Sequence, residues 1–375
     1  MIEKKKICFV VSSPFTATVF LLKHFEYLSN EFEVYLVANL EGKHVFESKY
    51  VKQIKDLNIR RGISIIDDFK AIFRLKKYFK ENNFDAVHSV TPKAGLLSMI
   101  ASKFANVKIR IHIFTGQVWH TKSGNFRFIL KQMDKLIVFC ATHILVDGEC
   151  QRQFLIQNKI VKEKNSKVLG KGSISGADEF FFVPNNLMYK EHRDKLGIKD
   201  EVLFLFLARI TYDKGIIDLV NAFVKLNSNY SNTKLLIIGP DEDNLVSKII
   251  EITKNKDVII KGTTNKLLES LQVADVVCLP SYREGFGTVV IQASLLEKPV
   301  ICSDNYGLME TIIDGETGLR HKVGDVESIL EQMKKIMDTN LRDALGKNGR
   351  RYVIDNFSAE IISSKWLEFY KMILA

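Results

Sequence analysis

Residues 202–239, VLFLFLARITYDKGIIDLVNAFVKLNSNYSNTKLLIIG, contain two short apolar runs separated by a longer amphipathic segment. The runs at 202–207 and 234–238 are rich in Val, Leu, Ile and Phe, which is typical of buried strands. Between them, GIIDLVNAF repeats apolar residues at the spacing of a helix. A strand, a helix and a second strand in this order predict a right-handed βαβ unit in a parallel sheet.

The same alternation runs along the whole chain and falls into two series. Strand-like runs of the first series lie at 7–12, 33–38, 63–67, 85–90, 108–114 and 143–147. Those of the second series lie at 202–209, 234–239, 257–262, 275–281 and 299–304. We therefore expect an α/β protein with two Rossmann-like, doubly wound parallel-sheet domains that face a cleft, because ligands bind at the carboxyl ends of such strands.

The joint between the two series is expected at 169–186, where Gly and Ser cluster and Pro184 follows an aromatic run. This places the first domain at 1–180 and the second at 185–357. A final apolar segment at 358–375 has helical spacing, and we expect it to pack back on the first domain. A chain of 375 residues is long enough for two such cores.

Composition excludes several classes of protein. The 46% hydrophobic and 26% charged content is that of a globular protein, and no apolar run reaches the length of a spanning helix. Five scattered cysteines without metal-type spacing indicate buried thiols in the cytoplasm.

The net charge of +10 attracts anions, but without zinc-finger, RNP-like or Arg-rich motifs we expect no nucleic acid partner. SSPFTATVF, after the first strand, lacks the glycines of a dinucleotide fingerprint, which argues against a nicotinamide oxidoreductase.

Two turns of the second domain carry residues suited to a phosphorylated ligand. RITYDKG places Arg209 at a strand end and Lys214 at the following helix start, where cations and free amides together bind a diphosphate. Alternatively, Lys214 is a solvated surface lysine and Arg209 pairs with an acid. In SYREGFGT, residues 281–288, the amides of Phe286, Gly287 and Thr288 suit a phosphate.

Glu284 and Gly285 belong to the same turn. The carboxylate of Glu284 can only accept hydrogen bonds, which suits sugar hydroxyls, and Gly285 leaves the backbone open to an anion. The alternative is a plain strand-to-helix turn with Glu284 as its cap.

In the first domain, polar residues follow the fourth and fifth strands. We expect these candidates for acceptor binding to face the cleft: His88, Lys93, Thr115, Gly116, Gln117 and His120. His112 lies inside its strand and is expected to be a core residue, and for His88 a core role is an equal alternative. Carboxylate pairs suited to a hydrolase are scarce, and no metal-ligand cluster is evident.

Taken together, these motifs resemble the family-4 retaining glycosyltransferases of the GT-B fold, and among them the bacterial capsule, O-antigen and N-glycan assembly transferases. The resemblance extends over almost the whole chain. It rests on VHSVTPKAGLLSMIA, FTGQVW, GSISGAD, LARITYDKGI, ADVVCLPSYREGFGTVVIQAS and KPVICSDNYGLMETIIDGETGL.

The resemblance implies transfer of a sugar, an N-acetylhexosamine or a hexose, from a UDP-sugar held by the second domain. Arg209 and Lys214 would then neutralise the diphosphate, and Glu284 would orient the donor sugar. Retention by front-face attack requires no protein nucleophile, no metal and no cofactor. The sequence departs from the family at Gln292, where relatives have a Glu that binds ribose, and at Thr115, where many have a His.

The resemblance also implies a polyprenyl-diphosphate saccharide as acceptor and contact with the anionic inner leaflet of the cytoplasmic membrane. The segments FKAIFRLKKYFK and NFRFILKQMDKL alternate apolar and cationic residues at helical spacing, as membrane-surface helices do. A solvated face on a buried helix is an equal alternative for each. A non-hydrolysing UDP-sugar epimerase and a non-catalytic nucleotide-sugar-binding subunit remain as other functions.

Overall fold

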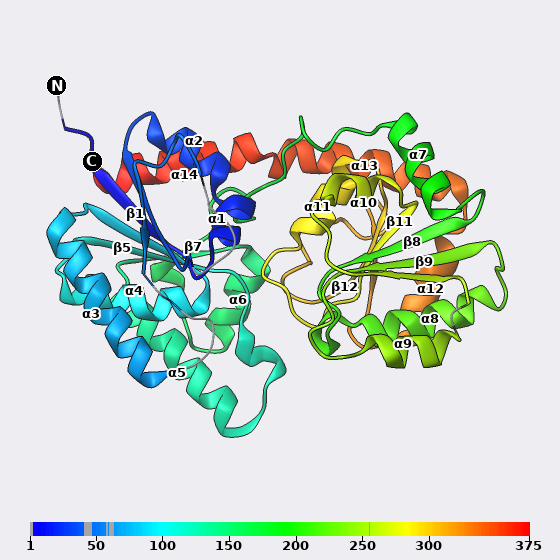
Figure 1. The fold of residues 1–375 in the computed structure, drawn as a ribbon, viewed down its shortest axis with the longest axis horizontal. Coiled ribbons are helices and arrows are strands. Elements are labelled where there is room, and N and C mark those ends of the chain that lie inside the picture. The colour runs from blue at the N-terminus through cyan, green and yellow to red at the C-terminus, as the bar shows by residue number, and fades with distance from the viewer. Residues whose placement is uncertain (1–2, 41–46, 58, 60–63, 255) are drawn as a thin grey trace. The chain divides into compact units, whose positions relative to one another are not determined.

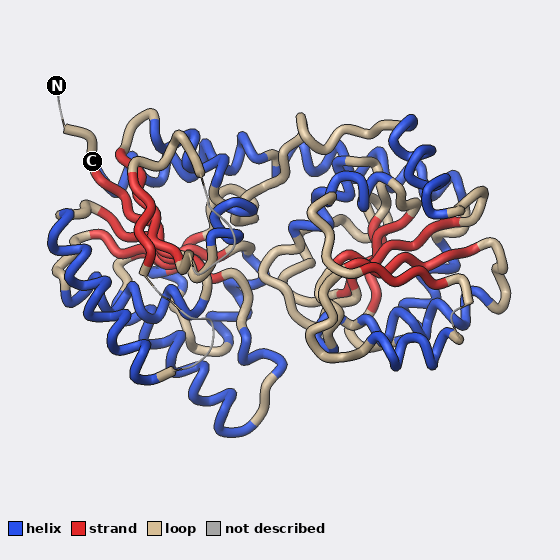
Figure 2. Tube along the Cα trace, viewed as in Figure 1, coloured by secondary structure: helices blue, strands red, loops and turns tan. Residues whose placement is uncertain are grey.

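The computed structural model describes residues 3–40, 47–57, 59, 64–254 and 256–375 (Figure 1). Two compact units divide the chain: Met1–Gly176 with Ala359–Ala375, and Ala177–Ser358. In each unit a parallel sheet has helices on both faces (Figures 1 and 2). Ala177 begins the second unit, and its amide donates a hydrogen bond to the Phe357 carbonyl at 2.9 Å.

The sheet of the first unit is built around β1. Its seven parallel strands have the order β3-β2-β1-β4-β5-β6-β7, so β1 pairs with both β2 and β4. The strands are β1 (Lys6–Val10), β2 (Glu33–Ala38), β3 (Gln53–Asp56), β4 (Ala86–Val90), β5 (Ile109–Phe114), β6 (His143–Val146) and β7 (Ser166–Lys167). The order reverses between β1 and β4, as in a doubly wound fold.

Alternate residues of β1 enter opposite core layers, as the strand geometry requires. Ile7 and Phe9 pack with residues of α2 and α14 on one face, and Cys8 and Val10 pack with residues of α3, α4 and α5 on the other. The helices are α1 (Pro14–Phe20), α2 (Leu22–Ser29), α3 (Ile65–Asn82), α4 (Pro92–Phe104), α5 (Gly124–Cys140), α6 (Glu149–Gln157) and α14 (Ala359–Leu374), with 3₁₀ turns η1 (Val118–Thr121) and η2 (Glu163–Asn165).

The strand expected at 63–67 is wrong. The chain is helical from Ile65 onward, and residue 63 lies outside the described residues. Ser64 is extended before the helix and donates a hydrogen bond to Asp67, while Asp67 and Asp68 place negative charge in its first turn. Such charge stabilises a helix N-terminus. The strand of this region is instead the short, largely exposed β3.

The second unit has a six-stranded parallel sheet in the order β10-β9-β8-β11-β12-β13. Its strands are β8 (Val202–Leu207), β9 (Thr233–Ile238), β10 (Val258–Lys261), β11 (Val276–Leu279), β12 (Val300–Ser303) and β13 (Leu319–His321). Its helices are α7 (Asn186–Leu196), α8 (Ile216–Asn227), α9 (Val246–Thr253), α10 (Leu267–Gln272), α11 (Thr288–Leu295), α12 (Val326–Lys335) and α13 (Thr339–Phe357), with the 3₁₀ turn η3 (Tyr212–Lys214). The two central strands, β8 and β11, are neighbours, so the loops that follow them meet at one edge of the sheet.

Candidate functional site

The loops after β8 and β11 are held against each other by a close backbone approach. Gly215 has a φ of +69°, and a Cβ there would lie 2.0 Å from the Pro280 carbonyl oxygen, so only glycine fits. The amide of Tyr282 also donates to the Asp213 carbonyl at 2.9 Å. The segment with Lys214 is therefore fixed beside the segment with Glu284.

An ion pair joins the two loops at this point. Lys214 Nζ lies 2.5 Å from Glu284 Oε1, and the two side chains are only 14% and 15% exposed. The hydroxyl of Ser281 donates to the same carboxylate oxygen at 2.7 Å. Two of the three predicted catalytic residues are thus in direct contact.

Arg209 lies at the edge of the same cluster. Its guanidinium contacts Glu242 at 2.6 Å and is 42% exposed, so the pairing with an acid that the sequence left open is present. Burial lowers the pKa of Arg209, but the hydrogen bond to Glu242 and the charges of Glu242, Asp213 and Glu284 raise it overall. The charge of Glu284 is the smallest of these contributions to the pKa of Arg209.

Asp213 connects the cations of the cluster. It accepts hydrogen bonds from Thr211 at 2.6 Å and from Arg283 at 2.8 Å. Partial burial raises the pKa of Asp213, but the Thr211 hydrogen bond and the charges of Arg283, Lys214 and Arg209 outweigh burial and lower it. The carboxylate stays ionised and holds Arg283 beside the two predicted cations.

The turn at 284–288 is tightly packed. Gly285 is buried, and the ring of Phe286 lies 5.2 Å from that of Phe357 in the core. A Cβ on Gly287 would lie 2.3 Å from Leu308. The amide of Gly287 donates to Gly307 at 3.3 Å, and that of Thr288 donates to Phe286 at 2.7 Å. A phosphate at this turn would therefore compete with internal hydrogen bonds for two of the three predicted amides.

Gln292 lies on α11, one turn after Thr288, and is half-buried. Among the described residues its side chain has no hydrogen-bond partner. Its amide is available for a ligand at this helix.

Sequence reasoning missed the residues that support this turn from β12. Ser303 and Asn305 both donate hydrogen bonds to the Ser281 carbonyl, the latter at 2.8 Å. A Cβ on Gly307 would lie 2.3 Å from the Glu284 carbonyl oxygen. A sequence pattern that indicates these residues is the polar stretch SDNYG, residues 303–307, at the end of a strand. Ligands bind at this edge of a parallel sheet.

His88, in the first unit, is a core residue and is not open to a ligand. It is fully buried in β4, its Nδ1 lies 2.6 Å from the Tyr370 hydroxyl, and its ring stacks on Trp366 at 4.9 Å. Burial lowers its pKa well below the usual value, with smaller contributions from His112 and His24. The expectation that His88 faces a cleft is wrong, because this face of β4 is covered by α14.

The other first-unit candidates lie after β4 and β5. Lys93 lies in the first turn of α4 and pairs with Asp68 of α3 at 2.5 Å. Gln117 is buried and accepts a hydrogen bond from Gln151 at 3.3 Å, while the His120 ring contacts Phe154 edge-on at 4.9 Å. Gln117 and His120 thus pack towards α6.

Lys93, Thr115 and Gly116 line a cavity of about 250 Å³. Its remaining wall is mainly apolar and consists of Pro92, Leu96, His112, Ile113, Phe114, Val118, Trp119, Phe126, Leu130, Met133, Asp134 and Ile137. His112 is buried, as expected, and its Nδ1 lies 2.9 Å from the Ser89 hydroxyl. Asp134 accepts a hydrogen bond from Trp119 Nε1 at 2.7 Å, and burial raises the pKa of Asp134 to about 6.

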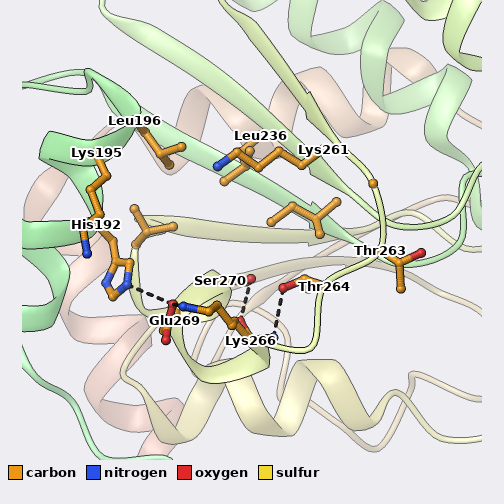
Figure 3. Close-up of a pocket in the computed structure, with 13 residues that line it drawn as sticks. His192, Lys195, Leu196, Leu236, Lys261, Thr263, Thr264, Lys266, Glu269 and Ser270 are labelled. Atoms are coloured by element: carbon orange, nitrogen blue, oxygen red, sulfur yellow. Dashed lines mark hydrogen bonds and ion pairs between the residues drawn. The ribbon is translucent and has the colours of Figure 1, made fainter.

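A hollow of about 310 Å³ lies in the second unit beside β10 (Figure 3). Its polar wall contains a chain of contacts in which Glu269 binds His192 at 3.1 Å and Lys266 at 3.2 Å. Leu236 and the residues after β10, including Thr263, form other walls. The hollow shares no lining residue with the charged cluster around Lys214.

Within the described ranges, no three His, Cys, Asp or Glu side chains are grouped so as to hold a metal ion. No helix in this part of the chain is both long and apolar enough to span a membrane.

Two family models match the chain. Residues 188–352 match the glycosyl transferases group 1, and residues 6–147 match the glycosyl transferase 4-like family. The Staphylococcus aureus capsular polysaccharide biosynthesis glycosyltransferase CapM is 33% identical over 91% of this chain and 89% of its own. The chain belongs to the family-4-like glycosyltransferases. The family inferred from the motifs is confirmed, and the retaining mechanism stays a prediction.

A second relative of this glycosyltransferase is named for its lipid-linked substrate. The Campylobacter jejuni N,N'-diacetylbacillosaminyl-diphospho-undecaprenol alpha-1,3-N-acetylgalactosaminyltransferase is 24% identical over 88% of this chain and 90% of its own. Among solved structures, Anabaena HepE in complex with UDP and glucose superposes with a TM-score of 0.82 at 16% identity, covering 98% of this chain and 100% of HepE. The predicted GT-B class with two parallel-sheet units is thereby confirmed.

Proposed function

We propose that this glycosyltransferase moves a hexose or N-acetylhexosamine from a UDP-sugar to a saccharide carried on a polyprenyl diphosphate, with retention of configuration. The observation that carries the proposal is the contact between Lys214 and Glu284, which joins a cation and a carboxylate from two neighbouring loops at one sheet edge. A cation suits a diphosphate and a carboxylate suits sugar hydroxyls, so the pair suits a ligand in which a diphosphate and a sugar are joined.

The donor's diphosphate binds at the cationic side of the cluster. Lys214 and Arg209 neutralise the charge that develops on the diphosphate as the bond to the sugar breaks, and such preorganised charge lowers a reaction barrier. Arg209 is the more exposed of the two, and its pairing with Glu242 holds it in place until the donor arrives. Asp213 pairs with Arg283 at 2.8 Å beside Lys214.

Glu284 orients the sugar. Its carboxylate accepts hydrogen bonds from sugar hydroxyls, and the Ser281 hydroxyl fixes its position. The acceptor hydroxyl attacks the anomeric carbon on the face that the diphosphate leaves, and its proton passes to the departing phosphate oxygen. This transfer needs no protein nucleophile, no metal and no cofactor. Gln292 binds the ribose through a neutral amide, more weakly than a carboxylate would.

The proposed acceptor is supported by the Campylobacter relative, whose name states an undecaprenyl diphosphate substrate. CapM, which is named for capsular polysaccharide biosynthesis, supports a role in surface polysaccharide assembly. Transfer to a lipid-linked saccharide requires the protein to reach a membrane surface.

Exposed aromatic side chains on two helices, α3 and α5, provide that contact in this proposal. On α3, Phe69 and Phe73 are 61% and 65% exposed, and on α5, Phe128 and Phe139 are 64% and 71% exposed. Between them α4 contacts both helices (Figure 1). We call these four residues the α3–α5 aromatic surface. They alternate with the exposed cations Lys70, Arg74, Lys77, Lys80 and Lys135.

Aromatic rings that insert at the headgroup boundary, with cations beside them, bind anionic lipid. The proposal therefore places this glycosyltransferase in the cytoplasm, peripheral to the inner face of the cytoplasmic membrane.

A donor screen tests the function. Purified protein is incubated with each of several UDP-sugars and a polyprenyl-diphosphate saccharide, and released UDP and lipid-linked product are measured together. The expected result is stoichiometric UDP and extended glycolipid with one preferred donor. Epimerised UDP-sugar without an acceptor, or UDP-sugar binding without transfer to any acceptor, would contradict the proposal.

A further inference from the structure

Two ion pairs of opposite polarity lie side by side in the second unit. The loop after β8 carries Asp213 and then Lys214, whereas the loop after β11 carries the cation first. Asp213 pairs with Arg283 at 2.8 Å. Lys214 pairs with Glu284 at 2.5 Å. Neighbouring residues therefore bridge the same two loops twice, once in each direction of charge.

The Lys214–Glu284 pair is arranged to change partners. In the proposed function, Lys214 exchanges Glu284 for a phosphate of the donor. Both contacts of the carboxylate, with Lys214 and with the Ser281 hydroxyl, use Oε1. Within the described residues, Oε2 of Glu284 accepts no hydrogen bond. One oxygen of this carboxylate is thus already without a protein partner.

The Asp213 carboxylate, in contrast, has protein partners on both oxygens. Its Oδ1 accepts a hydrogen bond from the Thr211 hydroxyl at 2.6 Å, and its Oδ2 accepts one from Arg283 at 2.8 Å. The backbone carbonyl of Asp213 also accepts from the Tyr282 amide at 2.9 Å. Asp213 therefore holds two consecutive residues of the other loop, directly before Glu284.

The Asp213–Arg283 pair is costly to open because it is largely buried. The two side chains are 22% and 18% exposed. Within the part of the chain that the structure describes, Nε of Arg283 is buried without a hydrogen-bond partner, so the guanidinium depends on its carboxylate. Removing one partner of a buried pair leaves an uncompensated charge, whereas an exposed pair such as Arg209–Glu242 opens easily.

The residue between these charges is held at a second point. The Tyr282 hydroxyl donates a hydrogen bond to Asp218 of α8 at 2.7 Å. A Cβ on Gly324 would lie 2.9 Å from this hydroxyl, so the glycine leaves room for the ring. The loop after β11 is therefore tied to its neighbours through residues 282 and 283, and Glu284 is the next residue along the chain.

We propose that Asp213 and Arg283 are positioning residues, whose ion pair keeps the two loops in register while Lys214 and Glu284 change partners. The inference rests on the proposed function for that change of partners. The Asp213–Arg283 pair is the fixed bridge, and the Lys214–Glu284 pair is the exchanging pair. The fixed bridge sets the spacing between the ammonium group that binds phosphate and the carboxylate that binds the sugar.

Hydrogen exchange at the Tyr282 amide tests the fixed bridge without any sugar transfer. Arg283→Met and Lys214→Met each replace a cation by an unbranched apolar side chain, so the second is the matched control for the first. We expect exchange to accelerate about tenfold or more in Arg283→Met and less than about threefold in Lys214→Met. Mass spectrometry with fragmentation resolves this amide. Equal acceleration in both variants, or none in either, would overturn the bridge.

UDP should leave the fixed bridge closed. In the unmodified protein, saturating UDP should not accelerate exchange at Tyr282, and acceleration would mean that the bridge opens with the ligand and is not fixed. Circular dichroism and thermal melting establish that the variants fold. If Arg283→Met does not fold, Asp213→Asn takes its place with Glu284→Gln as its matched control, since each replaces a carboxylate by an amide.

A double-mutant cycle in the transfer reaction tests the positioning role. Asp213→Asn, Arg283→Met and the double variant break the same bridge, so we expect the same loss of kcat, about tenfold, in all three. The affinity for UDP, measured by calorimetry, should change less than about twofold, because Lys214 and Arg209 remain. Losses that multiply in the double variant, or weaker UDP binding in Arg283→Met alone, would show that Arg283 contacts the donor itself and does not act through Asp213.

Failure of the proposed function looks different. In that case exchange at Tyr282 responds as expected in the variants, but the unmodified protein transfers no sugar to a polyprenyl-diphosphate saccharide. Conversely, an unchanged kcat in folded Arg283→Met would refute the positioning role and leave the proposed function intact.

Discussion

The ammonium group of Lys214 lies 2.5 Å from the Glu284 carboxylate, although 70 residues separate them along the chain. Each side chain has its position fixed by its own loop: Gly215 lets the first loop approach Pro280, and Ser281 holds the carboxylate in the second. In the proposed function, Lys214 exchanges Glu284 for phosphate when a donor binds, and Glu284 then binds sugar hydroxyls. The ion pair thus holds the two proposed donor-binding groups next to each other.

Restoring a carboxylate at position 292 should strengthen donor binding. Gln292→Glu replaces a neutral amide by a charged acceptor, and charge-assisted hydrogen bonds are roughly twice as strong as neutral ones. We expect KM for the UDP-sugar to fall by about three- to tenfold, with little change in kcat. Steady-state kinetics with a 2′-deoxyribose donor provide the control, since the gain should vanish there. An equal gain with both donors would show that residue 292 does not contact the ribose.

The packing of α14 on the first unit should make stability depend on pH. His24 Nε2 donates to the Ile174 carbonyl at 2.6 Å, its Nδ1 accepts from Ser363 at 3.0 Å, and its ring stacks on Trp366 at 4.0 Å. Burial lowers the pKa of His24 from 6.5 to about 4. Between these values the unfolded chain binds more protons, so stability is lost as pH falls from about 6.5 to about 4.

Thermal melting of the unmodified protein and of His24→Gln across this range measures the effect. The variant should be less stable at pH 7.5 because it loses the stacked ring, but its Tm should fall less on acidification. Identical pH slopes in the two proteins would show that His24 is not a source of the acid sensitivity.

Asp134 should make the folded state less stable as the pH rises, whereas His24 makes it less stable as the pH falls. Burial raises its pKa from 3.8 to about 6, so ionisation above pH 6 costs the folded state up to about 3 kcal/mol. Asp134→Asn keeps an acceptor for Trp119 and removes the charge. We expect the variant to be about 1–3 kcal/mol more stable than the parent at pH 7.5 and equally stable near pH 4. Urea unfolding at both pH values checks this, and a destabilised variant at pH 7.5 would contradict it.

The α3–α5 aromatic surface should bind anionic membranes. Replacing Phe69 and Phe73 by Ser removes two inserted rings without touching the core, because both side chains are more than 60% exposed. Sedimentation with vesicles of phosphatidylglycerol should show about tenfold weaker binding by the variant, and neutral phosphatidylcholine vesicles should bind both proteins poorly. Phe180→Ser, at a 72% exposed phenylalanine of the second unit, is the matched control. Equal vesicle binding by the α3 variant and this control would show that α3 does not contact the membrane.

Long apolar runs made most of the fold predictable. Strands β1 and β8 are largely buried and carry nearly continuous apolar runs, and β5 alternates apolar residues with Arg110 and His112. The missed strands were β3, β7 and β13, because edge strands of two to four residues are too short to show an apolar pattern. The nearby run at 63–67 was apolar enough to suggest a strand, but Asp67 and Asp68 stabilise the start of α3 there.

At the candidate site, residue type and position after a strand were enough to expect Arg209, Lys214 and Glu284 at one edge of the sheet, and their role in donor binding stays a prediction. The partners of these residues were not predictable, since Glu242 and Asp213 owe their roles to how loops pack. His88 was ambiguous because a strand sequence does not say which helix covers it; α14, from the far end of the chain, does. The cavity near Thr115 depends on the packing of β5, α4 and α5, which no local pattern encodes.

The central claim is that Arg209, Lys214 and Glu284 form the donor site, and transfer by single variants tests it most directly. Initial rates with the preferred UDP-sugar and lipid acceptor are compared for Arg209→Ala, Glu284→Gln and the surface control Lys225→Ala, whose lysine pairs with Glu327 on exposed helix faces. We predict that kcat falls by about 100-fold or more in the first two and is unchanged in the control, with all three folded. Near-normal kcat in both Arg209→Ala and Glu284→Gln would contradict the account.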